Sequence, residues 1–422
     1  MSAADNARIA QLASDRAVHR AFSWLHLHEP QLRRWQTEFV AIPAPPFGES
    51  VRAAWFARRF MELGLSNTHI DSEGNVLAEL RPAVETPDIS APIVLLSAHL
   101  DTVFPAGTDC TPREEGTRIL APGACDNGAG LTALLALAAA LRSAEMTLPC
   151  TVLFAANVGE EGEGDLRGMR SIFSESPYAG RIATAIALEG AGEATVVDRA
   201  LGSRRLRVTL TGPGGHSWAD AGRPNPILAL ASALLNVARI PLPRSPRTTL
   251  NVGTVQGGTS VNSIPEFATA DLDLRSTSSL QLDATELAVL KQIKESIAAE
   301  TARLGKSGQP GHDALALRVE RIGDRKAGAL PQQSPLLGSL RAVDRHLGLR
   351  TEPRIGSTDA NHPLSIGIPA LAIGAGGQGG GIHTLDEWYD TTGRDLALRR
   401  ILLLLLDTCA LSVNALLKPH VE

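Results

Sequence analysis

The stretch Ile93-Val94-Leu95-Leu96-Ser97-Ala98-His99-Leu100-Asp101 joins a continuous apolar run to two residues that can bind or orient a metal ion. A run such as Ile93–Ala98 is typical of a strand that is buried on both faces of a parallel sheet. His99 and Asp101 then follow the carboxyl end of that strand, where ligands of open α/β sheets bind. The stretch therefore predicts a buried parallel strand with chemistry at its end.

Strands and helices alternate on both sides of this stretch. We expect helices at 51–63 and 131–141, and further strands at 75–80, 151–156 and 183–188. Strands that alternate with helices in this way predict a largely parallel sheet with helices on both faces.

The pattern changes after Gly202. The order strand, helix, strand, strand, helix, strand is expected over 205–210, 226–238, 250–255, 269–274, 285–304 and 315–322. This order predicts a small α+β domain inserted in the larger one. A helix at 336–347, a strand at 370–373 and a helix at 397–417 then complete the first domain. The predicted fold is an α/β catalytic domain, 1–201 with 329–422, carrying an inserted α+β lid or dimerisation domain, 202–328.

The composition narrows the function classes. A chain of 422 residues with 44% hydrophobic and 20% charged residues is typical of a globular protein of more than one domain. The net charge of −5 does not favour nucleic acid as a partner. The four cysteines form no CxxC pair, residues 1–28 contain no continuous apolar region, and the runs 130–141 and 401–413 are too short to span a membrane. We therefore expect a cytoplasmic protein without a membrane or nucleic-acid partner.

Residues of the types that ligate metals occur at five places in the chain. Two histidines and several carboxylates that follow strand-like runs suit a pair of divalent cations, with Zn²⁺ as the first candidate and Co²⁺ or Mn²⁺ as alternatives. Asp126 lies on a glycine-rich loop at the start of a helix and is the best bridging ligand, although an isolated Asp there would be read as a helix N-cap. The five places are His99, Asp126, Glu160-Glu161, Glu189 and His383.

The residues beside these ligands suggest further roles. Asp101 can accept the second N–H of the His99 ring and fix its orientation. Because Glu160 and Glu161 are adjacent, one can bind metal while the other acts as a general base toward water. A solvated acidic turn is the alternative for this pair.

Three residues of the inserted domain are candidates for contact with the substrate. His216 lies among glycines and could stabilise an oxyanion, unless it is an ordinary turn histidine. Asn262 and Arg275 could hold a substrate carboxylate. For Arg275, an ion pair with Asp271 or Asp273 is the competing hypothesis.

Taken in order, these motifs resemble the dinuclear zinc peptidases and deacylases, a family that includes carboxypeptidase G, acetylornithine deacetylase, succinyl-diaminopimelate desuccinylase and tripeptide aminopeptidase (peptidase T). The resemblance runs from Ile42-Pro43-Ala44-Pro45 to His383-Thr384-Leu385-Asp386-Glu387. It implies that His99 and Glu189 bind one zinc ion, that Glu161 and His383 bind the other, and that Asp126 bridges them. It also implies a general base at Glu160, an orienting acid at Asp101, substrate contacts from Asn262 and Arg275, and a homodimer through the inserted domain in which His216 reaches the active site of the other subunit.

The substrate is less specified by the resemblance. Asp126-Asn127-Gly128 and Asp359-Ala360-Asn361 are similar to the tripeptide aminopeptidase branch, whereas Glu189 stands where that branch tends to carry Asp and other exopeptidases and deacylases carry Glu. We expect a dizinc hydrolase that cleaves amide bonds of short peptides, an exopeptidase like tripeptide aminopeptidase. A carboxypeptidase or N-acyl-amino-acid deacylase with the same metal centre is the alternative, and a non-catalytic binding protein on the same fold is a third hypothesis.

Overall fold

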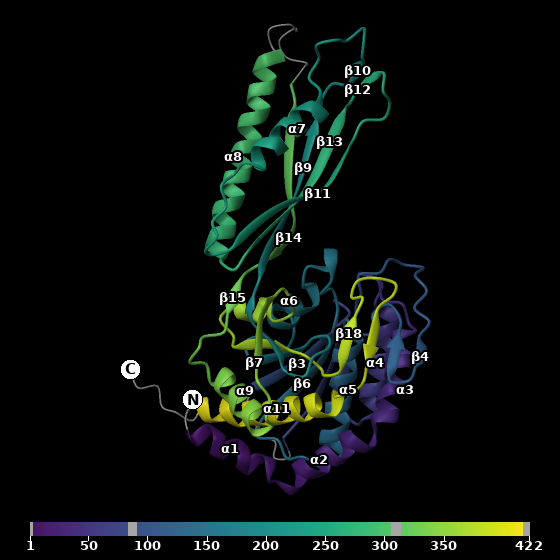
Figure 1. Ribbon diagram of the computed structural model, residues 1–422, viewed down its shortest axis with the longest axis vertical. Coiled ribbons are helices and arrows are strands. Elements are labelled where there is room, and N and C mark those ends of the chain that lie inside the picture. The colour runs from purple at the N-terminus through teal and green to yellow at the C-terminus, as the bar shows by residue number, and fades with distance from the viewer. Residues whose placement is uncertain (1–2, 83–90, 305–313, 417–422) are drawn as a thin grey trace. The chain divides into compact units, whose positions relative to one another are not determined.

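The computed structural model describes residues 3–82, 91–304 and 314–416, and Leu417, the last residue of the expected helix 397–417, lies outside them. The chain divides into two compact units (Figure 1). Unit 1 comprises 1–200 and 329–422, and unit 2 comprises 201–328.

Unit 1 is built on a nine-stranded sheet in the order β1-β2-β6-β3-β7-β17-β8-β15, with β16 paired to β8. Its centre, β6-β3-β7-β17, is parallel. The pairs β1–β2, β2–β6 and β17–β8 are antiparallel, whereas β16 pairs in parallel with β8. The expected mostly parallel sheet is confirmed. Its strands are β1 Ser66–Ile70, β2 Val76–Leu80, β3 Ile93–His99, β6 Thr151–Asn157, β7 Ile182–Leu188, β8 Thr195–Ala200, β15 Gly328–Ala329, β16 Glu352–Gly356 and β17 Ala370–Ile373.

Helices cover both faces of this sheet because successive side chains of its strands point to opposite faces. In β3, Val94 and Leu96 enter the larger core, while Ile93 and Leu95 enter the second core. The larger core is formed with α1 Ala3–Ala13, α2 Arg16–Leu27, α3 Glu29–Val40, α4 Ser50–Glu62, α5 Gly128–Ser143, α9 Pro335–His346 and α11 Arg394–Leu416. The second core is formed with α6 Arg167–Ser174, beside the short helix α10 Asn361–Ser365.

The long apolar helices α5 and α11 are core elements of unit 1. Residues 128–141 of α5 are buried throughout, and α11 contacts β3 and β7. Across the described parts of the chain, none of the helices combines the length and the apolar character that a membrane crossing requires.

A small four-stranded sheet, in the order β18-β19-β5-β4, was not expected from the sequence. It pairs Trp388 with Leu120 and Tyr389 with Ile119. The loop before Asp126 and the loop that carries His383 are thereby held next to each other. The strands are β4 Arg113–Glu115, β5 Arg118–Leu120, β18 Gln378–Gly380 and β19 Trp388–Asp390.

Unit 2 is the expected separate α+β unit. Its antiparallel sheet has the order β11-β13-β9-β14, and α7 and α8 pack against it around a core of its own. A two-strand pair, β10 with β12, lies outside this sheet. The elements are β9 Gly202–Thr211, β10 Gly215–His216, α7 Pro226–Val237, β11 Thr248–Gly257, β12 Ser263–Ile264, β13 Phe267–Ser276, α8 Ser279–Leu304 and β14 Ala316–Arg325.

Candidate metal centre

The ends of neighbouring parallel strands bring most of the candidate ligands of unit 1 together. His99 is the last residue of β3, Glu160 and Glu161 follow β6, and Glu189 directly follows β7. Since β6, β3 and β7 are parallel neighbours, their carboxyl ends share one edge of the sheet. Asp126 reaches this edge from the loop before α5, and His383 from the loop between β18 and β19.

The side chains form two ligand groups that share Asp126. In the first group, His99 Nε2 lies 3.2 Å from Asp126 Oδ1 and 3.5 Å from Glu189 Oε1. In the second, His383 Nε2 lies 3.1 Å from Asp126 Oδ2 and 3.1 Å from Glu161 Oε1. The two oxygens of one carboxylate therefore face two different histidines, which is the arrangement that a bridging ligand requires.

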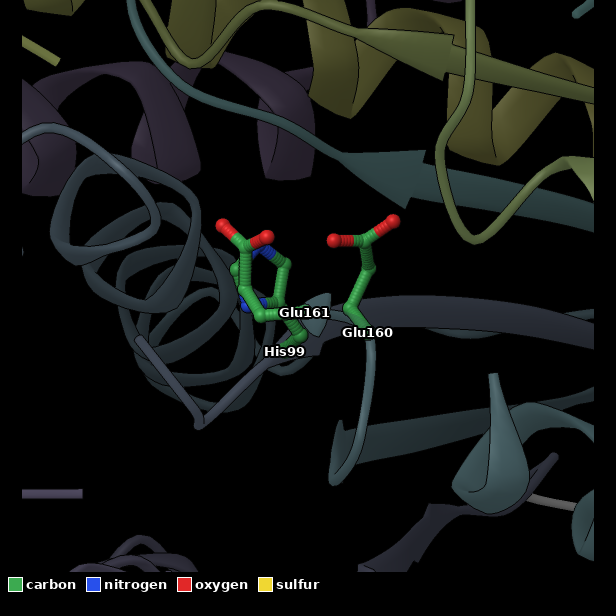
Figure 2. A group of neighbouring side chains, drawn as sticks. All are labelled: His99, Glu160 and Glu161. Atoms are coloured by element: carbon green, nitrogen blue, oxygen red, sulfur yellow. The ribbon is translucent and has the colours of Figure 1, made fainter. Parts of the chain in front are cut away.

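Glu160 lies beside members of both ligand groups. His99, Glu160 and Glu161 offer ligand atoms within 4.8 Å of one another, and Figure 2 shows the two carboxylates directed to the same side of the loop. Glu160 and Glu161 are 6% and 8% exposed, so the pair is not a solvated acidic turn.

Several atoms of this cluster are buried without a hydrogen-bond partner, namely His99 Nε2, Asp126 Oδ1 and Glu189 Oε2. Buried polar atoms are almost always satisfied in folded proteins. A divalent cation would satisfy all three, because an imidazole nitrogen and carboxylate oxygens are the ligands that Zn²⁺ accepts. The residues present therefore fit a metal centre.

Electrostatics lead to the same conclusion. Burial, together with the charge of Asp126, raises the pKa of Glu161 to about 7. Burial also raises the pKa of Glu189. Asp126 and Glu161 in turn raise the pKa of His383 to about 9. Glu161 and Glu189 thus resist ionisation when only protons offset the charge of the cluster, and bound cations would remove that penalty.

The Asp101 carboxylate connects the first ligand group to the general-base candidate. Its two oxygens accept the backbone N–H groups of Glu160, at 3.1 Å, and of Glu161, at 2.7 Å. The Nδ1 of His99 lies 3.0 Å from the backbone oxygen of Asp101 and 3.6 Å from its carboxylate. Because a carbonyl only accepts, Nδ1 carries the proton and Nε2 keeps its lone pair for a metal.

Two residues that the sequence analysis did not single out fix the loop of Asp126. Asn127, and not Asp126, is the N-cap of α5, and its amide also donates to Leu188 O at the end of β7. Its cap position was a signal available in the sequence. Glu387 accepts hydrogen bonds from three backbone N–H groups of the loop, those of Gly123, Cys125 and Asp126. No local pattern indicates that second contact.

The three candidates for substrate contact lie in unit 2. His216 is exposed in β10, and its Nδ1 accepts the N–H groups of Trp218 and Ala219, which leaves the proton on Nε2. Asn262 is exposed. Arg275 in β13 donates to Asp273 Oδ2 at 2.6 Å, so the ion pair considered as its competing role is present.

The profile of peptidase family M20/M25/M40 matches residues 95–406. The chain belongs to this peptidase family. Among curated relatives, a probable carboxypeptidase of Aspergillus clavatus is 30% identical over 252 residues, 54% of each chain. One of Aspergillus flavus is 30% identical over 210 residues, 45% of this chain and 47% of the relative. The chain thus spans about half the length of the curated relatives it matches.

Solved structures share the fold over most of the chain. Aminopeptidase PepT from Bacillus cereus superposes with a TM-score of 0.67 at 21% identity, covering 90% of this chain and 98% of that structure. The YxeP protein of Bacillus subtilis, described as a dinuclear metal binding peptidase of family M20, superposes with a TM-score of 0.66 at 14% identity, with the same coverage of 90% and 98%.

Proposed function

We propose that this chain is a metal-dependent exopeptidase that hydrolyses amide bonds of short peptides at a pair of divalent cations, with Zn²⁺ as the first candidate and Co²⁺ or Mn²⁺ as alternatives. The observation that carries the proposal is Asp126, whose two oxygens each complete a separate group with one histidine and one glutamate. His99 and Glu189 would hold one cation, and Glu161 and His383 the other.

The remaining residues of the site suit amide hydrolysis. When bound, the cations would supply Lewis acidity, which lowers the pKa of water and polarises a carbonyl. Glu160 would take a proton from the attacking water while the oxygen of that water forms a bond to the carbonyl carbon. As the C–N bond breaks, Glu160 would pass that proton to the leaving amine. Asp101 would keep Glu160 in place through its backbone N–H.

Release of an amino-terminal residue, as in tripeptide aminopeptidase, is the first candidate for the direction of cleavage. The segments Asp126-Asn127-Gly128 and Asp359-Ala360-Asn361 support it. A carboxypeptidase is the second candidate, because the curated relatives carry that name. An N-acyl-amino-acid deacylase would use the same centre. In the last two, Arg275 and Asn262 would contact the substrate carboxylate, and Arg275 would exchange Asp273 for it.

The test uses the zinc- or cobalt-loaded protein with unblocked and N-acetylated tripeptides in one mixture, and mass spectrometry of the products. Loss of the first residue from unblocked peptides alone supports the aminopeptidase. Cleavage of the acetylated peptides supports a carboxypeptidase or deacylase, according to the bond broken.

A Glu160→Gln variant tests the proposed base in the same assay. It should retain its metal while turnover falls by about 10²–10⁴-fold. Glu163→Gln, an exposed neighbour on the short helix Gly162–Gly164, is the matched control and should remain active. Near-normal turnover by Glu160→Gln would refute the assignment.

We also propose a homodimer through unit 2, in which His216 serves the partner's site. The edge strand β11 is mostly exposed, including Val255 at 58%, and an unpaired strand edge is a template for pairing with a second copy. Light scattering should give twice the chain mass for the wild type and a single chain mass for Val255→Pro. A wild-type monomer at micromolar concentration would refute the dimer.

A further inference from the structure

A fully buried arginine lies next to the metal-type groups without touching them. Arg52 in α4 is 0% exposed, and among the described residues no carboxylate forms an ion pair with it. A buried guanidinium without an anionic partner is costly, because its desolvation is repaid only by hydrogen bonds. Packing alone would be served better by an apolar side chain of similar size, so the groups that Arg52 binds are informative.

Within the described residues, the hydrogen bonds of Arg52 go to backbone carbonyls of two segments. Its Nε donates to Ile42 O at 2.9 Å and its Nη2 to Val40 O at 3.4 Å, at the end of α3 and just beyond it. Its Nη1 donates to Leu100 O at 2.8 Å. Leu100 is the residue between His99 and Asp101. Arg52 therefore ties the loop at the end of β3 to the segment that precedes α4.

A second contact runs in parallel with the first. The N–H of Thr102 donates to Ala44 O at 2.9 Å. The loop is thus held on both sides of Asp101 by the segment 40–44. The Arg52 contact is made by a side chain and can be removed by a substitution, whereas the donor at Thr102 is a backbone N–H.

The charge of Arg52 faces the same loop. Burial lowers its pKa to about 10, and the nearby groups Cys110 and Asp101 oppose that change, so the side chain stays cationic at neutral pH. The buried Asp101 carboxylate lies in the electric field of the Arg52 guanidinium. It accepts hydrogen bonds from the backbone N–H groups of Glu160 and Glu161. The Arg52 cation thus lies near a buried anion without forming a salt bridge with it, while His99 Nδ1 lies 3.6 Å from that carboxylate.

We infer that Arg52 is a positioning residue of the metal centre, which fixes the Leu100 peptide so that the His99 ring and the Asp101 carboxylate meet their partners. This inference rests on the proposed metal function. Without Arg52, Leu100 O loses this donor, and the Leu100–Asp101 peptide loses a contact that fixes its orientation, although the N–H of Leu100 still donates to Asn157 O at 2.6 Å. The first ligand group, and through Asp101 the position of Glu160, would then be poorly defined.

The experiment measures metal binding by the metal-free protein, independently of activity. Zn²⁺ affinity is read by titration calorimetry, and ligand geometry by the absorption spectrum of bound Co²⁺. Arg52→Met should lower the affinity for the ion held by His99 and Glu189 by about 10–100-fold, the usual effect of losing a group that orients a metal ligand. Arg204→Met is the control, since Arg204 is also buried but forms ion pairs within unit 2, and it should lower stability without changing the Co²⁺ spectrum.

Arg52→Lys keeps the test decisive if Arg52→Met does not fold. Lysine keeps the charge but offers no planar fork, so it cannot bind all the carbonyls at once. Its Co²⁺ spectrum and its affinity for the first ion should change, in a protein whose circular dichroism matches the wild type. Wild-type affinity and spectrum in the folded variants would overturn the inference while the metal centre stands. A wild-type protein that binds no divalent cation would instead overturn the proposed function.

Discussion

Replacing Glu387 by glutamine tests whether the loop of Asp126 is held in place from the His383 side. Glu387 Oε1 accepts the N–H groups of Cys125 and Asp126, each at 2.8 Å, and Oε2 accepts that of Gly123 at 3.0 Å. A glutamine oxygen can keep the first two bonds. Its amide group would then face the Gly123 N–H, so one hydrogen bond is lost and one buried donor is left unsatisfied.

The expected cost follows from that count. Leaving one buried donor unpaired costs about 1–3 kcal/mol of unfolding free energy. Because the loop carries Asp126, which both ligand groups share, we expect Glu387→Gln to lower the affinity for both ions by about 10–100-fold. Urea unfolding of the metal-free protein measures the first effect, and titration calorimetry with Zn²⁺ the second.

Glu79→Gln is the matched control for this experiment. Glu79 is also buried and accepts hydrogen bonds from Tyr178 and Asn67, but it lies in β2 away from the ligand groups. It should lose stability and keep its metal affinity. Equal metal affinities for Glu387→Gln and the wild type would refute the reasoning, even if stability fell as expected.

Two other predictions concern charge at the same edge of the sheet. Asp126→Asn should abolish tight binding of both ions together, whereas substitution of the exposed Asp109 by Asn should not. If calorimetry shows that Asp126→Asn still binds one ion with wild-type affinity, Asp126 does not bridge the two ions. Burial raises the pKa of Asp359 to about 7 in the folded protein, so its proton stabilises the metal-free fold fully below about pH 4 and this contribution is lost as the pH rises to about 7. Asp359→Asn should therefore flatten the pH dependence of unfolding between pH 4 and 7 by on the order of 4 kcal/mol, as measured in urea; an unchanged slope would contradict this.

The strands that end at the candidate site could be predicted, because each is marked by an apolar run in the local sequence. Ile93–Ala98 is apolar at every position but Ser97, and β3 occupies that run and ends on His99. The same holds for β6 before Glu160 and for β7 before Glu189. Helices α1 to α3 were not predicted, although Val18, Ala21 and Leu25 of α2 are buried at helical spacing, a pattern that the sequence does show.

The contacts that hold the candidate metal ligands in place could not be predicted, because they join residues far apart in the chain. Glu387 lies more than 250 residues from the loop it binds, and neither partner has a sequence pattern that names the other. Arg52 would be assigned to the surface from its residue type. The strands of the small sheet are three residues each, too short for a periodic signal, yet they place His383 beside Asp126.

The chain leaves unit 1 and returns to it on neighbouring strands. β8 ends at Ala200, β15 begins at Gly328, the two are adjacent in the sheet, and the N–H of Leu330 donates to Asp198 O at 2.9 Å. To unit 1, the whole of unit 2 is therefore topologically equivalent to a hairpin turn. A module attached in this way can be lengthened, exchanged or lost without altering strand order, because its two ends meet where a short turn would also suffice. The two units are thus free to diverge at different rates.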